Sequence, residues 1–417
     1  MPLRFIISFL CLPIAEIYSF ILVRSTLRSL PHPWRIGLMT LYILVTLATW
    51  IGLLFFRKID WTLLPSAVKN IYIAFTIGFL VGKLLILLIM VIDDARRILQ
   101  WLTTKIVPST TTPTITTSPT EGISRSLFLK RMALLLGGLS VTGFLYGMTN
   151  RYQYRIKRIS LKFDHLPAAF KGMKVLQLSD IHSGSFQDHQ AVQHGINMAL
   201  QEKPDIIFFT GDLVNNKAEE ITPYLNVFSQ LTAPMGVYSV LGNHDYGDYV
   251  SWPSPASKNK NLEDLKAAHS KMGWKLMMNE HIILEKGEDK IAVIGIENWS
   301  AKANFPKHGD MKQAYTGLTE KNIPFKILLS HDPSHFDAQV ITDYPDIDLT
   351  LSGHTHGMQF GIEIPNFKWS PSQFVYKKWA GLYETGKQFL YVNRGFGFLG
   401  YPGRLGILPE ITVIELA

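Results

Sequence analysis

Long apolar runs separated by basic loops dominate the first 150 residues of the chain. The runs 36–56 and 71–92 supply the roughly 20 predominantly apolar residues that a membrane-spanning helix needs. The runs 5–23 and 132–149 lie nearer the lower limit, and a cleavable signal or a buried helix is the alternative for these two. The pattern predicts four membrane-spanning segments.

These runs divide the N-terminal part into three regions. We predict a three-helix transmembrane region over 1–100, a Thr/Ser/Pro-rich linker over 101–130 and a fourth membrane helix or signal-anchor over 131–150. Two charges interrupt the apolar runs, Glu16 in the first and Lys83 in the third. Because a lone charge in a bilayer is costly, one hypothesis pairs them across the two helices. The alternative is a protonated Glu16 and a Lys83 that reaches toward the interface.

The pattern changes beyond residue 150, where short β-rich runs alternate with amphipathic stretches. A helix is predicted over about 187–203. The expected strands are 174–178, 205–210, 237–241, 291–296, 326–330, 348–352, 389–393 and 410–416. We therefore expect a separate α/β domain over 151–417, with two sheets packed face to face and helices outside them.

Composition supports this division. Of the 417 residues, 47% are hydrophobic and the net charge is +8. Much of the positive charge flanks the apolar runs, which favours a lipid bilayer as partner and gives no reason to expect nucleic acid. The one cysteine excludes an intramolecular disulfide.

Basic residues also predict an orientation. They are most numerous in the loops after the first and third runs, which the positive-inside rule places in the cytoplasm. The C-terminal domain would then lie on the extracytoplasmic side of the inner membrane. The segment Ser124-Arg125-Ser126-Leu127-Phe128-Leu129-Lys130 resembles a twin-arginine export motif in which Ser126 replaces the second arginine, and an ordinary basic flank is the alternative.

Five groups of polar residues lie between residues 178 and 357, most of them directly after a predicted strand. They are Ser179-Asp180-Ile181-His182, Gly211-Asp212, Gly242-Asn243-His244-Asp245, Ser330-His331-Asp332 and Gly353-His354-Thr355-His356-Gly357. Each group alone is an ordinary turn sequence, but chance rarely places five such groups in order. Strand ends of an open α/β sheet converge, so these side chains are expected to meet.

Carboxylates, an amide oxygen and imidazoles together suit a pair of divalent metal ions. Asp180 and His182 are two residues apart, so in extended geometry they share a face and reach one ion. The Asp212 carboxylate has two oxygens and can bridge two ions. Two ions about 3.5–4 Å apart orient a hydroxide and neutralise phosphate oxygens. His244 is then free to protonate a leaving oxygen, with Asp245 orienting its ring.

Together these motifs resemble the calcineurin-like metallophosphoesterase superfamily over about 174–417, and the membrane-anchored bacterial branch in particular. Further likeness lies in Pro234-Met235-Gly236-Val237-Tyr238 and in Asn393-Arg394-Gly395. The resemblance implies a four-layer α/β/β/α sandwich with a dinuclear centre. One metal would be held by Asp180, His182, Asp212 and His356. The other would be held by Asp212, Asn243, His331 and His354.

The resemblance implies a membrane-anchored hydrolase of phosphomono- or phosphodiesters, with Mn²⁺, Fe²⁺ or Fe³⁺, Zn²⁺ or Mg²⁺ as cofactors and a lipid-linked ester as a candidate substrate. Some similar proteins cleave the pyrophosphate of UDP-2,3-diacylglucosamine, a cytoplasmic substrate that conflicts with the predicted orientation. A non-catalytic receptor or scaffold is the third alternative. Arg394 and Arg404 could clamp a phosphate or pair structurally, for instance with Glu410. The insert 246–266 is either a substrate lid or a solvated loop.

Overall fold

The structure is a computed structural model that describes residues 3–55, 58–59, 61–106, 125–302, 305, 307–318 and 321–417. The chain divides into two compact units, Met1–Tyr146 and Gly147–Ala417.

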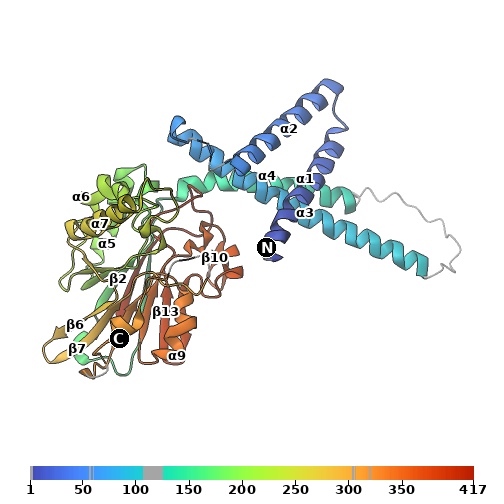
Figure 1. Ribbon diagram of the computed structural model, residues 1–417. Helices are drawn as coiled ribbons and strands as arrows, with labels where there is room; N and C mark the ends of the chain where they lie inside the picture. Colours follow the sequence, from blue (N-terminus) through green and yellow to red (C-terminus); the bar gives the residue numbers. More distant parts are fainter. Residues whose placement is uncertain are drawn as a thin grey trace. The chain divides into compact units, whose positions relative to one another are not determined.

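The first unit is helical (Figure 1). Its elements are α1 (Leu3–Leu27), α2 (His32–Phe55), the short turn η1 (Trp61–Leu63), α3 (Ser66–Ile106) and α4 (Arg125–Gly147). Among the described residues, three helical stretches are long and apolar enough to cross a membrane: His32–Phe55, Ser66–Thr103 and Arg125–Asn150. The first predicted run does form a helix, α1, and its membrane crossing stays a prediction.

The helix α3 extends past the predicted third run, which ends at residue 92, and its last part, 93–106, carries several charged residues. Asp93 is buried there and is paired with Arg96 at 2.8 Å and with Arg97 at 2.9 Å, which are i,i+3 and i,i+4 contacts on one helix face. The helix continues to Ile106, beyond residue 101, where the linker is expected to begin. The central part of the linker, 107–124, lies outside the described residues.

The two charges inside the apolar runs meet. Lys83 Nζ lies 2.6 Å from Glu16 Oε2, which confirms the predicted pair between the first and third helices. Tyr42 and Trp50 of α2 each donate a hydrogen bond to the same carboxylate at 3.2 Å, and Lys83 also donates to Thr46 Oγ1. The cluster satisfies its charges within the helical unit and ties α1, α2 and α3 together.

Two six-stranded sheets form the second unit. The first has the order β1 (Arg155–Leu161), β14 (Glu410–Leu416), β2 (Lys174–Leu178), β3 (Ile206–Phe209), β4 (Val237–Ser239) and β5 (Lys275–Leu276). The second has the order β12 (Gly381–Thr385), β13 (Gln388–Val392), β9 (Leu349–Ser352), β8 (Lys326–Leu329), β7 (Asp289–Gly295) and β6 (Glu280–Lys286). A small antiparallel hairpin, β10 (Ile362–Ile364) and β11 (Phe367–Trp369), stands apart from both sheets.

Side-chain alternation along the strands builds the layers. On β3, Ile206 and Phe208 point into the core between the sheets, whereas Ile207 and Phe209 point to the outer face of the first sheet. That outer face is covered by α5 (His189–Gln201), α6 (Leu225–Phe228) and α7 (Pro255–Lys271). The outer face of the second sheet is covered by α8 (Met311–Tyr315), the π-helical turn η8 (Phe336–Val340) and α9 (Ile341–Asp343). Figure 1 shows α5, α6 and α7 gathered on one side of the domain and α9 beside β13. The predicted four-layer α/β/β/α sandwich is confirmed.

The strand pairings bring the polar groups together. The strands β2, β3 and β4 are parallel neighbours in one sheet, and β8 and β9 are parallel neighbours in the other. Their carboxyl ends therefore lie at one edge of the sandwich. Gln177 on β2 is fully buried and donates a hydrogen bond to the Ser352 carbonyl oxygen on β9 at 2.9 Å, which fixes the two sheets to each other immediately below that edge.

Candidate dinuclear metal site

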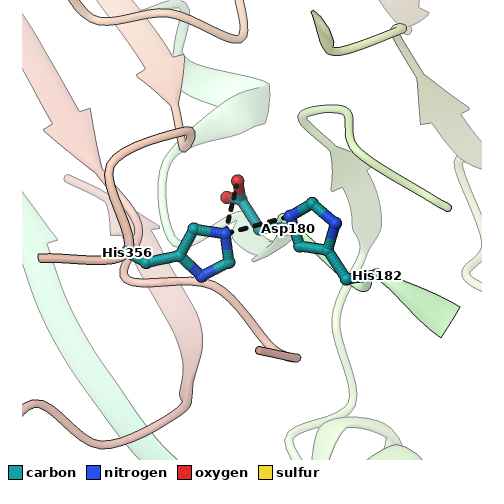
Figure 2. Close-up of side chains that lie close together, drawn as sticks. All are labelled: Asp180, His182 and His356. Atoms are coloured by element: carbon teal, nitrogen blue, oxygen red, sulfur yellow. Dashed lines mark hydrogen bonds and ion pairs between the residues drawn. The ribbon is translucent and has the colours of Figure 1, made fainter. Parts of the chain in front are cut away.

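A first cluster of potential ligands consists of Asp180, His182 and His356, from the loops after β2 and β9 (Figure 2). His182 Nε2 lies 3.0 Å from His356 Nε2, and His356 Nε2 lies 3.3 Å from Asp180 Oδ1. All three side chains are buried. Two imidazole nitrogens and a carboxylate oxygen thus lie close together, and each of these atoms can donate a lone pair to a metal ion. The cluster therefore fits a cation.

A second cluster consists of Asp212, His331 and His354, with Asn243 beside them. His331 Nε2 lies 3.2 Å from Asp212 Oδ2 and 3.3 Å from His354 Nδ1. The amide oxygen of Asn243 lies 2.7 Å from the same His354 nitrogen. His331 donates its Nδ1 hydrogen to the Thr210 carbonyl oxygen at 2.7 Å, which leaves Nε2 as the ligand atom.

The Asp212 carboxylate lies between the two clusters. Its Oδ2 atom is 3.5 Å from His182 Nε2 in the first cluster and 3.2 Å from His331 Nε2 in the second. Its Oδ1 atom accepts a hydrogen bond from the backbone N–H of His244 at 2.9 Å. One oxygen is thus held by the backbone while the other is available to both clusters, which is the position that a bridging ligand needs.

Burial and mutual charge set the protonation of these groups. Burial raises the pKa of Asp180 to about 7, and it lowers the pKa of His182 to about 3 and that of His354 to about 4. Burial also disfavours charge on Asp212 and His331, but their mutual attraction outweighs it. The pKa of Asp212 falls well below its usual range, and the pKa of His331 rises to about 10. Asp212 and His331 therefore form an oppositely charged pair at neutral pH.

The ligand geometry differs from the extended i, i+2 arrangement that the sequence predicts. Asp180, His182, Asp212, His354 and His356 all have left-handed backbone conformations, with φ between 48° and 72°. Such conformations are unfavourable for residues with a Cβ and concentrate at functional sites. The side chains converge because the backbone turns sharply at each strand end, not because neighbouring residues share one face of a strand.

Two glycines allow the turns to approach so closely. Gly211 has φ of 95°, and a Cβ there would lie 2.6 Å from the Gly242 nitrogen. A Cβ on Gly353 would lie 1.8 Å from Ser179 Oγ and 2.2 Å from Asp180 Oδ2. Any side chain at either position would separate the strand ends that carry the ligands.

His244 and Asp245 do not form the pair that the sequence predicts. The His244 ring donates its Nδ1 hydrogen to the Asn215 carbonyl oxygen at 2.7 Å, and the ring lies against Tyr249. Asp245 is fully buried and accepts four backbone N–H hydrogen bonds instead, from Asp212, Leu213, Val214 and Gly242. The prediction that Asp245 orients His244 is therefore wrong. Its carboxylate holds together the two loops that present Asp212 and Asn243.

Two tyrosines contact the ligands, and the sequence gives little signal for either. Asn243 donates an amide hydrogen to Tyr249 Oη at 2.8 Å, which turns its oxygen toward His354. Tyr376 Oη lies 2.7 Å from His354 Nε2 and donates to Asp332 at 3.3 Å. Tyr249 follows the Asn243 motif by six residues, a weak clue, whereas Tyr376 lies in an irregular segment with no motif around it.

The insert and the two arginines also differ from their functional interpretations. Most of 246–266 belongs to α7, which begins after the N-cap Ser254, and only the part before it approaches the site through Tyr249. Arg394 pairs with Glu410 and donates to Glu363 at 3.0 Å. Arg404 is fully buried and donates to backbone carbonyls, including that of Arg394 at 2.7 Å. Structural pairing, the alternative to a phosphate clamp, accounts for both arginines.

Comparison with known proteins agrees with this geometry. Residues 173–358 match the calcineurin-like phosphoesterase family, and residues 3–151 match a family described as probable calcineurin-like phosphoesterase, transmembrane domain. The uncharacterized metallophosphoesterase YkuE of Bacillus subtilis is 31% identical over 308 residues, which are 70% of this chain and 98% of that protein. The chain belongs to the calcineurin-like phosphoesterases, and it is a membrane protein.

Two further relatives indicate how far the likeness extends. A transmembrane protein with metallophosphoesterase domain from Danio rerio is 30% identical over 309 residues, covering 72% of this chain and 65% of the relative, so this chain spans only part of that relative's length. The UDP-2,3-diacylglucosamine pyrophosphatase LpxG of Chlamydia muridarum is 26% identical over 288 residues, covering 58% of this chain and 81% of that protein.

Proposed function

We propose that this protein is a membrane-anchored phosphoesterase that hydrolyses phosphodiester bonds, and the related monoesters, with two divalent metal ions. The observation that carries the proposal is the single Asp212 oxygen that reaches both ligand clusters. When bound, a metal pair supplies an activated water as nucleophile and neutralises the charge of the phosphate. The complete set of ligands argues against the alternative of a non-catalytic receptor or scaffold.

In this proposal, the first ion is held by Asp180, His182, Asp212 and His356. The second ion is held by Asp212, Asn243, His331 and His354. The ions would be Mn²⁺, Fe²⁺ or Fe³⁺, Zn²⁺ or Mg²⁺. The clusters fit such ions because their nitrogen and oxygen atoms lie within 4.8 Å of one another, with the imidazoles of His182 and His354 held neutral at physiological pH.

His244 carries the proton transfer. Its Nδ1 hydrogen is fixed on the Asn215 carbonyl oxygen, so the ring cannot rotate freely and Nε2 is the atom left to face a substrate. Its backbone N–H at the same time holds Asp212. This residue therefore places a donor for the leaving oxygen at a fixed distance from the bridging carboxylate.

The test uses the full chain in detergent with Mn²⁺ and either bis(p-nitrophenyl) phosphate or p-nitrophenyl phosphate. We expect turnover that a chelator abolishes. His244→Asn should lower kcat by about 10²–10³-fold with metal content unchanged, because general acid catalysis contributes on that order. His194→Asn, an exposed histidine on α5, is the matched control and should keep full activity. No turnover with any divalent metal, despite two bound ions, would contradict the proposal.

We propose further that the chain crosses the inner membrane several times and carries its phosphoesterase domain on the extracytoplasmic side. The loops rich in basic residues support this orientation. The likeness to LpxG supports a second candidate substrate, the pyrophosphate of UDP-2,3-diacylglucosamine, which requires a cytoplasmic domain. A reporter fused after Ala417 separates the two, because alkaline phosphatase activity is expected only if the domain lies outside the cytoplasm.

A further inference from the structure

The hairpin β10–β11 has its polar face turned toward the domain and its apolar face turned outward. Its register pairs Glu363 with Lys368, and Ile364 with Phe367. Because side chains alternate along each strand, Glu363 and Lys368 share one face of the hairpin, while Ile364 and Phe367 lie on the other with Ile362. A soluble domain usually has the reverse arrangement.

Ion pairs and a hydrogen bond hold the polar face of the hairpin against the rest of the domain. Glu363 accepts hydrogen bonds from Lys157 on β1 at 2.9 Å and from Arg394 at 3.0 Å. Lys368 Nζ donates to the Ala380 carbonyl oxygen at 2.6 Å. These contacts fix which face of the hairpin meets the domain, so the exposure of the opposite face is built into the fold.

The outward side chains form an apolar surface, which we call the hairpin patch and define as Ile362, Ile364 and Phe367. Ile362 is 50% exposed, Ile364 is 57% exposed and Phe367 is 52% exposed. The turn η10 (Pro371–Phe374), which follows in sequence, also exposes an apolar side chain, Phe374 at 70%. An exposed apolar surface of this kind marks a site of interaction with a partner or a membrane.

The hairpin patch is connected to the metal site. The turn η9 (His356–Gln359) carries the ligand His356, and Ser370, which caps η10, donates to the Gly357 carbonyl oxygen of η9 at 2.6 Å. Two residues after Phe374, Tyr376 contacts the ligand His354 at 2.7 Å. A molecule bound to the hairpin patch is therefore beside the segments that hold both clusters.

We propose that the hairpin patch inserts into the surface of a lipid bilayer, so that the esters reaching the metal site are phosphate esters of lipids. The patch combines aromatic and branched aliphatic side chains at the tip of a hairpin, a composition suited to the bilayer interface. The chain's own membrane-length helices keep a bilayer within reach. The part of the proposal that concerns lipid substrates rests on the proposed phosphoesterase function. The part that concerns membrane docking does not.

Membrane docking is tested with the full chain in vesicles of phosphatidylcholine and phosphatidylglycerol. Cys11→Ser removes the one native cysteine. Phe367→Cys then carries an environment-sensitive fluorophore, and Glu288→Cys, in the exposed turn between β6 and β7, is the matched control. We expect a blue-shifted emission and quenching by spin-labelled lipid at position 367 only. Equal, water-like emission at both positions would overturn the proposal, as would energy transfer between labelled copies without lipid quenching, which would indicate a second copy as the partner.

The part that concerns lipid substrates is tested with two esters that share one leaving group, bis(p-nitrophenyl) phosphate in solution and phosphatidyl-p-nitrophenol in vesicles. The double variant Ile364→Asp with Phe367→Asp should lower turnover of the lipid ester about tenfold or more and leave turnover of the soluble ester unchanged. The reason is that two apolar side chains that insert into the bilayer are lost. Asn226→Asp with Ser270→Asp adds the same charge at exposed positions of α6 and α7 and should change neither. Equal effects on both esters would overturn this part of the proposal. Failure of the unaltered chain on both esters would contradict the phosphoesterase function instead.

Discussion

The Glu16–Lys83 pair of the helical unit and the His182–His356 pair of the phosphoesterase domain are both contacts between segments far apart in sequence. In the first, an acid lies 2.6 Å from a base, and two side chains of α2 donate further hydrogen bonds to the same carboxylate. In the second, two imidazole nitrogens lie 3.0 Å apart and a carboxylate oxygen lies 3.3 Å from one of them, so three atoms that can bind a metal ion meet at one point. The two contacts therefore differ in what they can do: an ion pair between an acid and a base holds helices together, whereas several metal-ligand atoms gathered at one point form a cation site.

Replacement of the bridging carboxylate should have the largest effect. Asp212→Asn removes the charge that both clusters share and should lower turnover of bis(p-nitrophenyl) phosphate about 10³-fold, with loss of bound metal. The metal content of the purified variant is measured and compared with that of the wild-type protein treated with a chelator. Retention of both ions and of activity within tenfold would show that Asp212 is not the bridge.

The stability of the helical unit should depend on the opposite charges of Glu16 and Lys83. Glu16→Gln or Lys83→Met alone leaves an uncompensated charge in an apolar setting and should destabilise the helical unit by about 3 kcal/mol. The exchange of both residues, Glu16→Lys with Lys83→Glu, should recover most of this loss in a thermal unfolding assay in detergent. A double exchange no more stable than the single variants would mean that the pair does not hold the helices.

The candidate metal site should bind metal more tightly as pH rises. In the metal-free site, Asp180 has its pKa raised to about 7 and His331 to about 10, so both are protonated at pH 6 and must release protons when a cation binds. The apparent Mn²⁺ affinity should rise steeply up to pH 7 and then about tenfold per pH unit, as calorimetry would show. Asp180→Asn should remove the extra steepness below pH 7. A flat profile from pH 6 to pH 8 would contradict these protonation states.

Loss of one tyrosine hydroxyl should give the smallest effect. Tyr376→Phe removes the hydrogen bonds to His354 and Asp332. Of the two, only the bond to His354 involves a metal ligand, so metal binding should weaken about fivefold, the value of one neutral hydrogen bond. Tyr249→Phe should act similarly through Asn243. Rescue of kcat at saturating Mn²⁺ would separate this positioning role from a structural one, and a loss that added metal does not rescue would count against it.

Sequence alone predicts most of the fold, because periodicity reports which face of a strand is buried. Ile206 to Phe209 read as one apolar run, and both faces of β3 are indeed covered. Sequence also separates the membrane helices from the domain. It misjudges the end of α3, where local ion pairs such as Asp93–Arg97 support a helix that continues beyond the predicted apolar run.

The candidate site is predictable in its composition but not in its geometry. Motifs identify Asp180 and His354, but nothing in them reveals that the backbone adopts a left-handed conformation at each. The partner of Asp245 is equally hidden, since four backbone N–H groups leave no trace in the sequence. Tyr376 joins the site only because the chain returns from a distant hairpin, a long-range contact that local patterns do not encode.

The left-handed backbone at five of the candidate ligands has a consequence for selection. Each such residue costs the fold on the order of 1 kcal/mol that glycine would recover. Random mutagenesis screened for heat resistance of the metal-free protein should therefore enrich glycine at positions such as Asp180 and His356. The surviving variants would resist heat better but would lack metal ligands. At this edge of the sandwich, the ligands therefore cost stability that the chemistry of the site requires.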